Sequence, residues 1–144
     1  MARLRLAAVI SLVLFLGLVA WTRGTFQPVN PDSPFEDLGD SPVRISGRIL
    51  LAEGVSEPQV VDLDLFAPDP LVPGGRRLIG KLKVTTGPFS FLAPANFGPM
   101  LIEVMADLDR DGPSPGDPFG VFLGNPLEVK SESVSEIDIL LQPM

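Results

Sequence analysis

The sequence contains no cysteine, no histidine and no tyrosine, and its only tryptophan is Trp21. The absence of cysteine excludes disulfides and thiolate catalysis. The absence of histidine removes the usual general base and the commonest metal ligand, so a Ser-His-Asp triad is impossible and a zinc site is not expected. Carboxylates are the main catalytic groups that remain. A carboxylate-based hydrolase of the glycosidase type is therefore the enzyme class that the sequence leaves open. Our prediction, however, is that the protein is not an enzyme.

Basic residues are few and unevenly distributed. Arg3, Arg5 and Arg23 lie near the N-terminus, and the rest of the chain has 8 basic and 18 acidic residues, a formal charge of −10. Phosphate backbones and anionic lipid headgroups repel so acidic a region, so we expect no nucleic-acid partner. The 16 prolines and 14 glycines indicate many turns and few long helices.

Residues 1–23 combine a short basic head with a 16-residue apolar run from Leu6 to Trp21, which predicts a helix. A cleaved signal peptide has such a head and an apolar stretch of about 7–15 residues. A membrane anchor needs about 17–25 apolar residues. Both interpretations remain open from the sequence, and both predict export. The rest of the chain would face the periplasm or the outside if the segment stays as an anchor, and it would be secreted if the segment is cleaved.

Residues 24–41 carry three prolines and four acidic residues without sustained periodicity, so we predict an extended linker, with a strand around Phe35 as the alternative. From residue 42 onward, apolar and polar residues alternate in short runs that are typical of strands with one buried face. These runs lie at 43–51, 61–65, 78–84, 89–91, 100–106, 119–123 and 137–141. The predicted fold class is all-β: an antiparallel β-sandwich of about seven strands over residues 42–144, preceded by one N-terminal apolar helix.

Several of these runs share a pattern with a known class of domain. The pattern consists of the runs Ile45–Ile49, Val60–Phe66, Thr85–Pro94, Ile102–Ala106 and Ile137–Leu141. It resembles carboxypeptidase regulatory-like (transthyretin-like) domains over about 43–106 and 134–141. The usual Pro-x-Gly-x-Tyr turn is replaced here by Asn96-Phe97-Gly98-Pro99-Met100. The resemblance implies a structural or binding module that is often exported, and it implies no active-site residues.

The strongest chemical signal is an acidic stretch in which Asp107, Asp109 and Asp111 alternate, a glycine follows, and Asp117 closes the run. Ca²⁺ takes about six to eight oxygen ligands, and Asp-x-Asp-x-Asp-Gly is a known way to supply them. The stretch is similar to the loops of dockerins and thrombospondin-type repeats up to the glycine, but its last acid comes one position earlier. We predict a Ca²⁺ site formed by Asp107, Asp109, Asp111 and Asp117, with a solvated turn as the alternative.

Two other charged groups have simpler explanations. Asp62 and Asp64 alternate with apolar residues, which indicates the solvent face of a strand. The basic residues between 76 and 83 are expected on an exposed strand face, where they balance nearby acids.

Together these patterns predict an exported, non-catalytic β-sandwich that acts as a binding or structural module of the cell envelope. Its acidic loop would be ordered by Ca²⁺, and its partner would be another envelope protein or a polymer. The membrane would be contacted through the N-terminal helix if that segment is not cleaved. The alternatives are a subunit that assembles through an exposed strand edge, and a carboxylate-based hydrolase.

Overall fold

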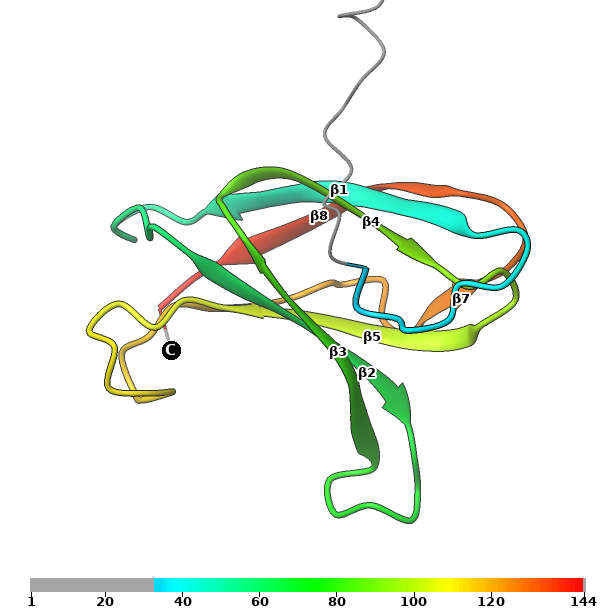
Figure 1. Ribbon diagram of the computed structural model, residues 1–144. Helices are drawn as coiled ribbons and strands as arrows, with labels where there is room; N and C mark the ends of the chain where they lie inside the picture. Colours follow the sequence, from blue (N-terminus) through cyan, green and yellow to red (C-terminus); the bar gives the residue numbers. More distant parts are fainter. Residues whose placement is uncertain (1–32, 144) are drawn as a thin grey trace, which may run out of the picture.

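The computed structural model describes residues 33–143, which form two packed β-sheets without a helix (Figure 1). The eight strands are β1 (Val43–Leu51), β2 (Val61–Pro68), β3 (Arg76–Val84), β4 (Gly87–Ala93), β5 (Gly98–Met105), β6 (Phe119–Val121), β7 (Leu127–Val129) and β8 (Val134–Leu141). The all-β sandwich is confirmed. The predicted N-terminal helix and most of the predicted linker lie outside the described residues.

The first sheet has the strand order β4-β1-β8, and the second has the order β3-β2-β5-β6, with β7 also paired to β5. All pairs are antiparallel except β1 with β8, which run parallel. The antiparallel sandwich predicted from the sequence is thus present, and the parallel pairing of β1 with β8 is the one departure from it among the described strands. The short strand β7 has no counterpart among the predicted runs, because its three residues follow a proline and are not part of a longer apolar run.

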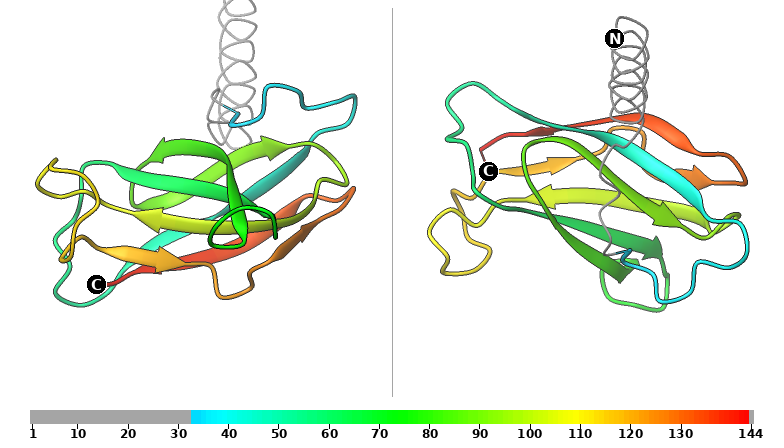
Figure 2. Two further views of the ribbon diagram at one scale, coloured as in Figure 1. Left: turned by 90° about the horizontal axis from the view of Figure 1, so that it is seen from below. Right: turned by 45° about the horizontal axis from the view of Figure 1, so that its top comes forward.

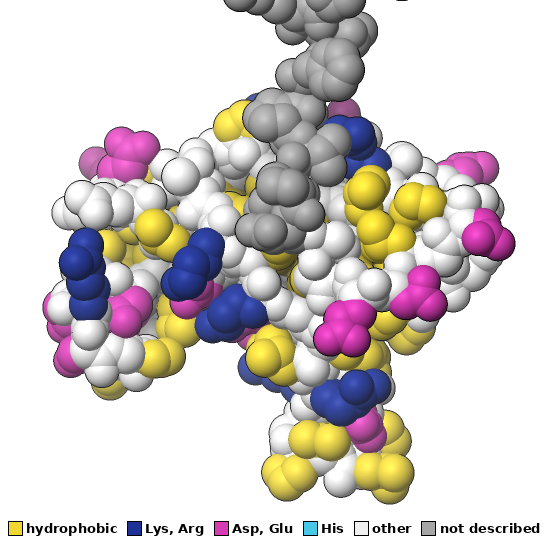
Figure 3. Space-filling view, in the orientation of Figure 1, with side chains coloured by type: hydrophobic (Ala, Val, Ile, Leu, Met, Phe, Trp, Pro, Cys, Tyr) yellow, Lys and Arg dark blue, Asp and Glu magenta, His cyan; other side chains and the backbone are white. Residues whose placement is uncertain are grey.

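The core lies between the two sheets and is built by alternation along each strand. Ile45 of β1, Phe91 of β4, Leu63 of β2 and Ile102 of β5 are all completely buried. Their neighbours in the sequence are partly exposed, as the period-2 pattern predicts, with the exception of Ser90 in β4, which is also buried. The β2–β3 hairpin extends away from this core, and its tip carries hydrophobic side chains (Figure 3).

Oppositely charged residues pair on the outer face of the second sheet. Lys81 Nζ lies 3.4 Å from Asp62 Oδ2 and 3.3 Å from Asp64 Oδ1, and Lys83 Nζ lies 3.1 Å from Asp62 Oδ1. Arg76 pairs in the same way with Glu103 of β5. Each such pair adds at most about 1 kcal/mol near the surface. The acids of β2 and the basic residues of β3 thus have the balancing role expected from the sequence.

One open side of the sandwich is closed by a seam between β6 and β8. The backbone N–H of Phe119 donates to the Gln142 oxygen at 2.9 Å, and the N–H of Gln142 donates to the Phe119 oxygen at 3.0 Å. The two strands come so close that a Cβ on Gly120 would lie 2.5 Å from the Leu140 carbonyl oxygen. A glycine is therefore needed in β6 for the seam to form.

The other open side, between β3 and β4, is covered by residues 33–35, which we call the strap. The Ser33 hydroxyl donates to the Leu92 carbonyl oxygen of β4 at 3.2 Å. Pro34 lies against Gly80 of β3, where an added Cβ would be 2.4 Å from the proline Cβ. Residues 33–42 contain no strand, but the strap at their start packs on the sandwich.

We expect Phe35→Ala to lower the free energy of unfolding by about 2 kcal/mol. The Phe35 ring is half-buried, packs against the core and lies edge-on to Phe97 with centroids 5.2 Å apart. Truncating a fully buried phenylalanine costs about 3–5 kcal/mol, and a half-buried ring should cost roughly half of that. Urea unfolding measures the change. Leu71→Ala is the control because that side chain is 92% exposed; equal effects of the two substitutions would contradict the role of the strap.

Candidate metal centre

The acidic residues lie on the loop that joins β5 to β6. The ends of this loop are held together, because Met105 is paired with Phe119 and the N–H of Ala106 donates to the Pro118 oxygen at 3.0 Å. The loop therefore starts and finishes at the same place, and residues ten positions apart in the sequence come into contact. It lies at the same end of the sandwich as the 52–60 connection (Figure 2).

Asp117 lies in the interior of the loop and holds it together through hydrogen bonds. Its side chain is buried, with 3% exposure. Oδ1 accepts the Leu108 N–H at 3.2 Å, and Oδ2 accepts the Ser114 N–H at 2.9 Å and the Ser114 hydroxyl at 3.2 Å. The backbone hydrogen bond from Ser114, followed by that from Leu108, lowers the pKa of Asp117 below its ordinary value. The loop is thus folded around an ionised carboxylate.

Asp107 organises the first half of the loop in the same way. Its Oδ1 accepts the Arg110 N–H at 2.7 Å, and its Oδ2 accepts the Gly112 N–H at 3.1 Å. Both donors have left-handed backbone conformations, with φ of 66° at Arg110 and 98° at Gly112. Glycine adopts such a φ without steric cost, which explains the glycine after the third aspartate. The carboxylate is thereby turned toward the interior of the loop.

Three carboxylates converge on one point. One oxygen from each of Asp107, Asp111 and Asp117 lies within 4.8 Å of the other two. Oxygens bound to one Ca²⁺ are at most about 4.6–5.2 Å apart, which is twice the Ca–O distance, so the three carboxylates are close enough to share one divalent cation. Backbone carbonyls of the loop and water would supply the remaining ligands.

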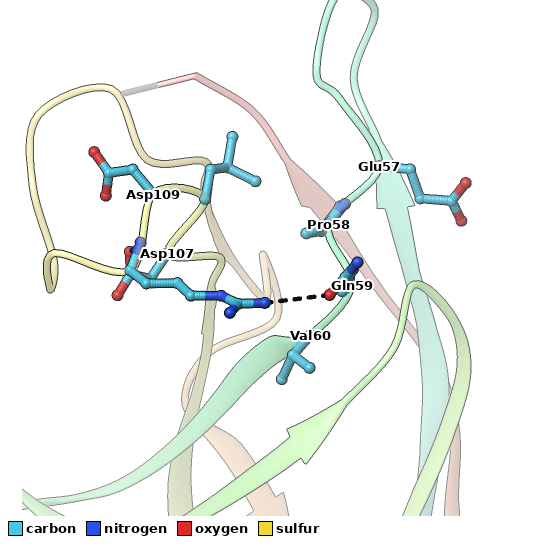
Figure 4. Close-up of a pocket in the computed structure, with 8 residues that line it drawn as sticks. Glu57, Pro58, Gln59, Val60, Asp107 and Asp109 are labelled. Atoms are coloured by element: carbon cyan, nitrogen blue, oxygen red, sulfur yellow. Dashed lines mark hydrogen bonds between the residues drawn. The ribbon is translucent and has the colours of Figure 1, made fainter.

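Asp109 lies outside this group of three, which we call the aspartate trio. Its Oδ1 accepts the N–H of Asp111 at 3.2 Å. In Figure 4 its carboxylate points away from the 57–60 segment that faces the loop. The structure thus brings together three of the four residues that the sequence singled out. Sequence alternation could not separate Asp109 from the others, because the left-handed residues of the loop change the direction of each side chain.

The carboxylates repel one another in the absence of a cation. The pKa of Asp111 is raised above its ordinary value, first by a hydrogen bond and charge repulsion from Asp109, then by burial and by the charges of Asp107 and Asp117. A bound divalent cation would remove this repulsion. The sequence had singled out the acids, but not Ser114 and Leu108, whose donors hold Asp117 in place.

No family model matches this chain, and no curated protein and no solved structure is significantly similar to it. The part of the chain that the structure describes contains no helix able to span a membrane. The interpretation of the centre therefore depends on its geometry.

Proposed function

We propose that this sandwich is an exported, non-catalytic binding module whose 107–117 loop is held in shape by Ca²⁺. The observation that carries the proposal is the convergence of the aspartate trio, whose oxygens lie within 4.8 Å of one another. A turn needs one or two aspartates, whereas a hard cation needs several carboxylates aimed at one point. The trio supplies them from a loop whose two ends are fixed by strand pairing.

Export is supported by the sequence and by the chemistry of the site. Residues 1–23 have the basic head and apolar run of a signal peptide or membrane anchor. Calcium modules outside the cell bind at about 10⁻⁴–10⁻³ M, an affinity that a site with three carboxylates can reach. We propose another envelope protein or a polymer as the partner, in line with the resemblance to carboxypeptidase regulatory-like domains.

Assembly through a strand edge has less support. The edge strand β3 carries Arg76, Arg77, Lys81 and Lys83, and the strap covers it at Gly80. Charged residues and covering segments are the usual means by which natural proteins protect their sheet edges.

Thermal unfolding of the full-length chain in a mild non-ionic detergent tests the calcium proposal. At a hundredfold excess over Kd, Ca²⁺ should add about 2.7 kcal/mol to the free energy of unfolding. For a domain of this size we expect the Tm to rise by roughly 10 °C relative to chelator. The same concentration of Mg²⁺ should give a much smaller rise. An unchanged Tm in millimolar Ca²⁺ would rule out an ordering role for the cation.

A further inference from the structure

Three adjoining hollows lie at the loop end of the sandwich. One, of about 420 Å³, lies between residues 57–60 and 107–110 (Figure 4). The second, of about 330 Å³, is lined by Val60, Asp62, Lys83, Asp107 and Arg110. The third, of about 370 Å³, extends to the start of β4. Val60 lines all three, so together they form one groove, which we call the Val60 groove.

The polar part of the groove is lined by two basic side chains, Lys83 and Arg110, and by the carboxylates of Glu57, Asp62, Asp107 and Asp109. Lys83 pairs with Asp62, whereas Arg110 is the basic side chain without an acidic partner. Its guanidinium donates to the neutral Gln59 Oε1 at 3.4 Å, across the first hollow (Figure 4). None of the ion pairs in residues 33–143 involves Arg110. A guanidinium has five N–H donors arranged to bind a carboxylate through two of them. Most of these donors are available to a ligand in the groove.

The carboxylates that line the groove already have donors. Asp62 pairs with Lys81 and Lys83. Asp107 accepts two backbone N–H groups of its own loop. Glu57 accepts the Thr86 hydroxyl at 2.9 Å, and Asp109 accepts the Asp111 N–H at 3.2 Å. Arg110 is thus free to bind an added anion, whereas the nearby acids restrict how much negative charge that anion can carry. A singly charged carboxylate fits this balance better than a doubly charged phosphate.

The other part of the groove is apolar. Val60 is 46% exposed, which is high for a residue next to a core strand. Val84, Pro88 and Phe89 line the third hollow beside it. An apolar surface of this kind gains free energy when a ligand side chain covers it.

The acidic loop fixes the position of Arg110. Its N–H bonds to Asp107 at 2.7 Å, and its φ of 66° is unusual for a residue with a side chain. Three aspartates are its neighbours in the sequence, yet its guanidinium turns toward Gln59 rather than to any of them. Backbone strain of this kind often marks functional positions.

We propose that the Val60 groove binds a peptide segment of a partner protein in which an aspartate or glutamate lies beside an apolar side chain. The carboxylate binds the Arg110 guanidinium, with the Lys83 ammonium nearby, and the apolar side chain covers Val60 and Pro88. This goes beyond calcium binding and names the chemistry of the partner. The same loop carries the aspartate trio and Arg110. The test therefore measures peptide binding with and without Ca²⁺, so that peptide binding and calcium binding are judged separately.

The probe is the peptide acetyl-Gly-Leu-Asp-Leu-Gly-amide, with Asn in place of Asp in the control peptide. It is titrated into the ¹⁵N-labelled full-length chain in detergent, once with Ca²⁺ and once with chelator. We expect chemical-shift changes centred on Val60, Lys83 and Arg110, and binding about 10-fold weaker for the control peptide, because a hydrogen bond to a charged group is lost.

Arg110→Gln should weaken binding of the aspartate peptide by about 10-fold. Arg44→Gln makes the same charge change near the opposite end of β1 and should leave binding unchanged. Equal binding of the two peptides, equal behaviour of the two variants, or no shift at millimolar peptide would overturn the proposal. Arg110-dependent binding in chelator supports the groove even if Ca²⁺ does not raise the Tm, so failure of one proposal is distinct from failure of the other.

Discussion

Gly47→Ala is expected to reduce the free energy of unfolding by more than about 4 kcal/mol, enough to leave much of the protein unfolded. A Cβ at this position would lie 1.9 Å from the Ile137 carbonyl oxygen and 2.7 Å from its carbon. The obstacle is backbone of the neighbouring strand, which cannot rotate away. The substitution therefore has to separate β1 from β8, the only parallel pair among the described strands.

Urea unfolding followed by circular dichroism measures this effect. Gly54→Ala is the matched control, because a Cβ there meets nothing within 4 Å but the backbone has a φ of 83°. Its cost is backbone strain alone, about 1–2 kcal/mol. If Gly47→Ala lowered the free energy of unfolding no more than Gly54→Ala does, the result would contradict the close approach of β1 and β8.

Asp111→Asn is expected to have opposite effects with and without calcium. In chelator at neutral pH the variant should unfold at a higher temperature than the wild type, because it removes a carboxylate that its neighbours repel. In millimolar Ca²⁺ it should unfold at a lower temperature, because one member of the aspartate trio is lost. We expect most of the calcium-dependent rise in Tm to disappear.

The pH dependence of the metal-free protein follows from two pKa shifts of opposite sign. The folded-state pKa of Asp111 is raised, so its stabilising contribution is complete below the ordinary pKa of 3.8 and is lost as the pH rises through the raised value. The pKa of Asp117 is lowered, so its contribution is complete above 3.8 and is lost as the pH falls through the lowered value. Without metal, Asp111→Asn should therefore unfold at about the same temperature as the wild type well below pH 3.8, where Asp111 is protonated, and at a higher temperature at neutral pH.

Asp109→Asn is the control for the metal-binding role. It also removes one negative charge, but it retains the side-chain oxygen that accepts the Asp111 N–H. Because Asp109 is outside the aspartate trio, this variant should keep most of the calcium-dependent rise. Equal loss of that rise in Asp109→Asn and Asp111→Asn would mean that the cation is attracted by the net negative charge of the loop and is not bound by a defined set of ligands.

Alternation of apolar and polar residues was sufficient to predict the fold class. In β2, Val61, Leu63 and Leu65 are fully buried, while Asp62 and Asp64 pair with lysines on the outer face. The period of two is a property of the extended chain itself, so it can be read without knowledge of neighbouring strands. The acidic composition of the 107–117 loop was equally visible, because it depends on consecutive residues.

Features that depend on contact between distant segments were decided by the tertiary structure. The parallel pairing of β1 with β8 and the docking of Ser33 on Leu92 join parts of the chain that no local pattern connects. In the loop, backbone reversals at Arg110 and Gly112 determine which aspartates converge and turn Arg110 toward Gln59. The sequence alone determined the two-faced strands and the position of the acidic loop. Only the packing of the sheets brought the 57–60 segment to that loop and created the groove between them. The side chains that line the groove could not be chosen from the sequence, because the direction of a side chain in a loop depends on backbone angles that residue order does not specify.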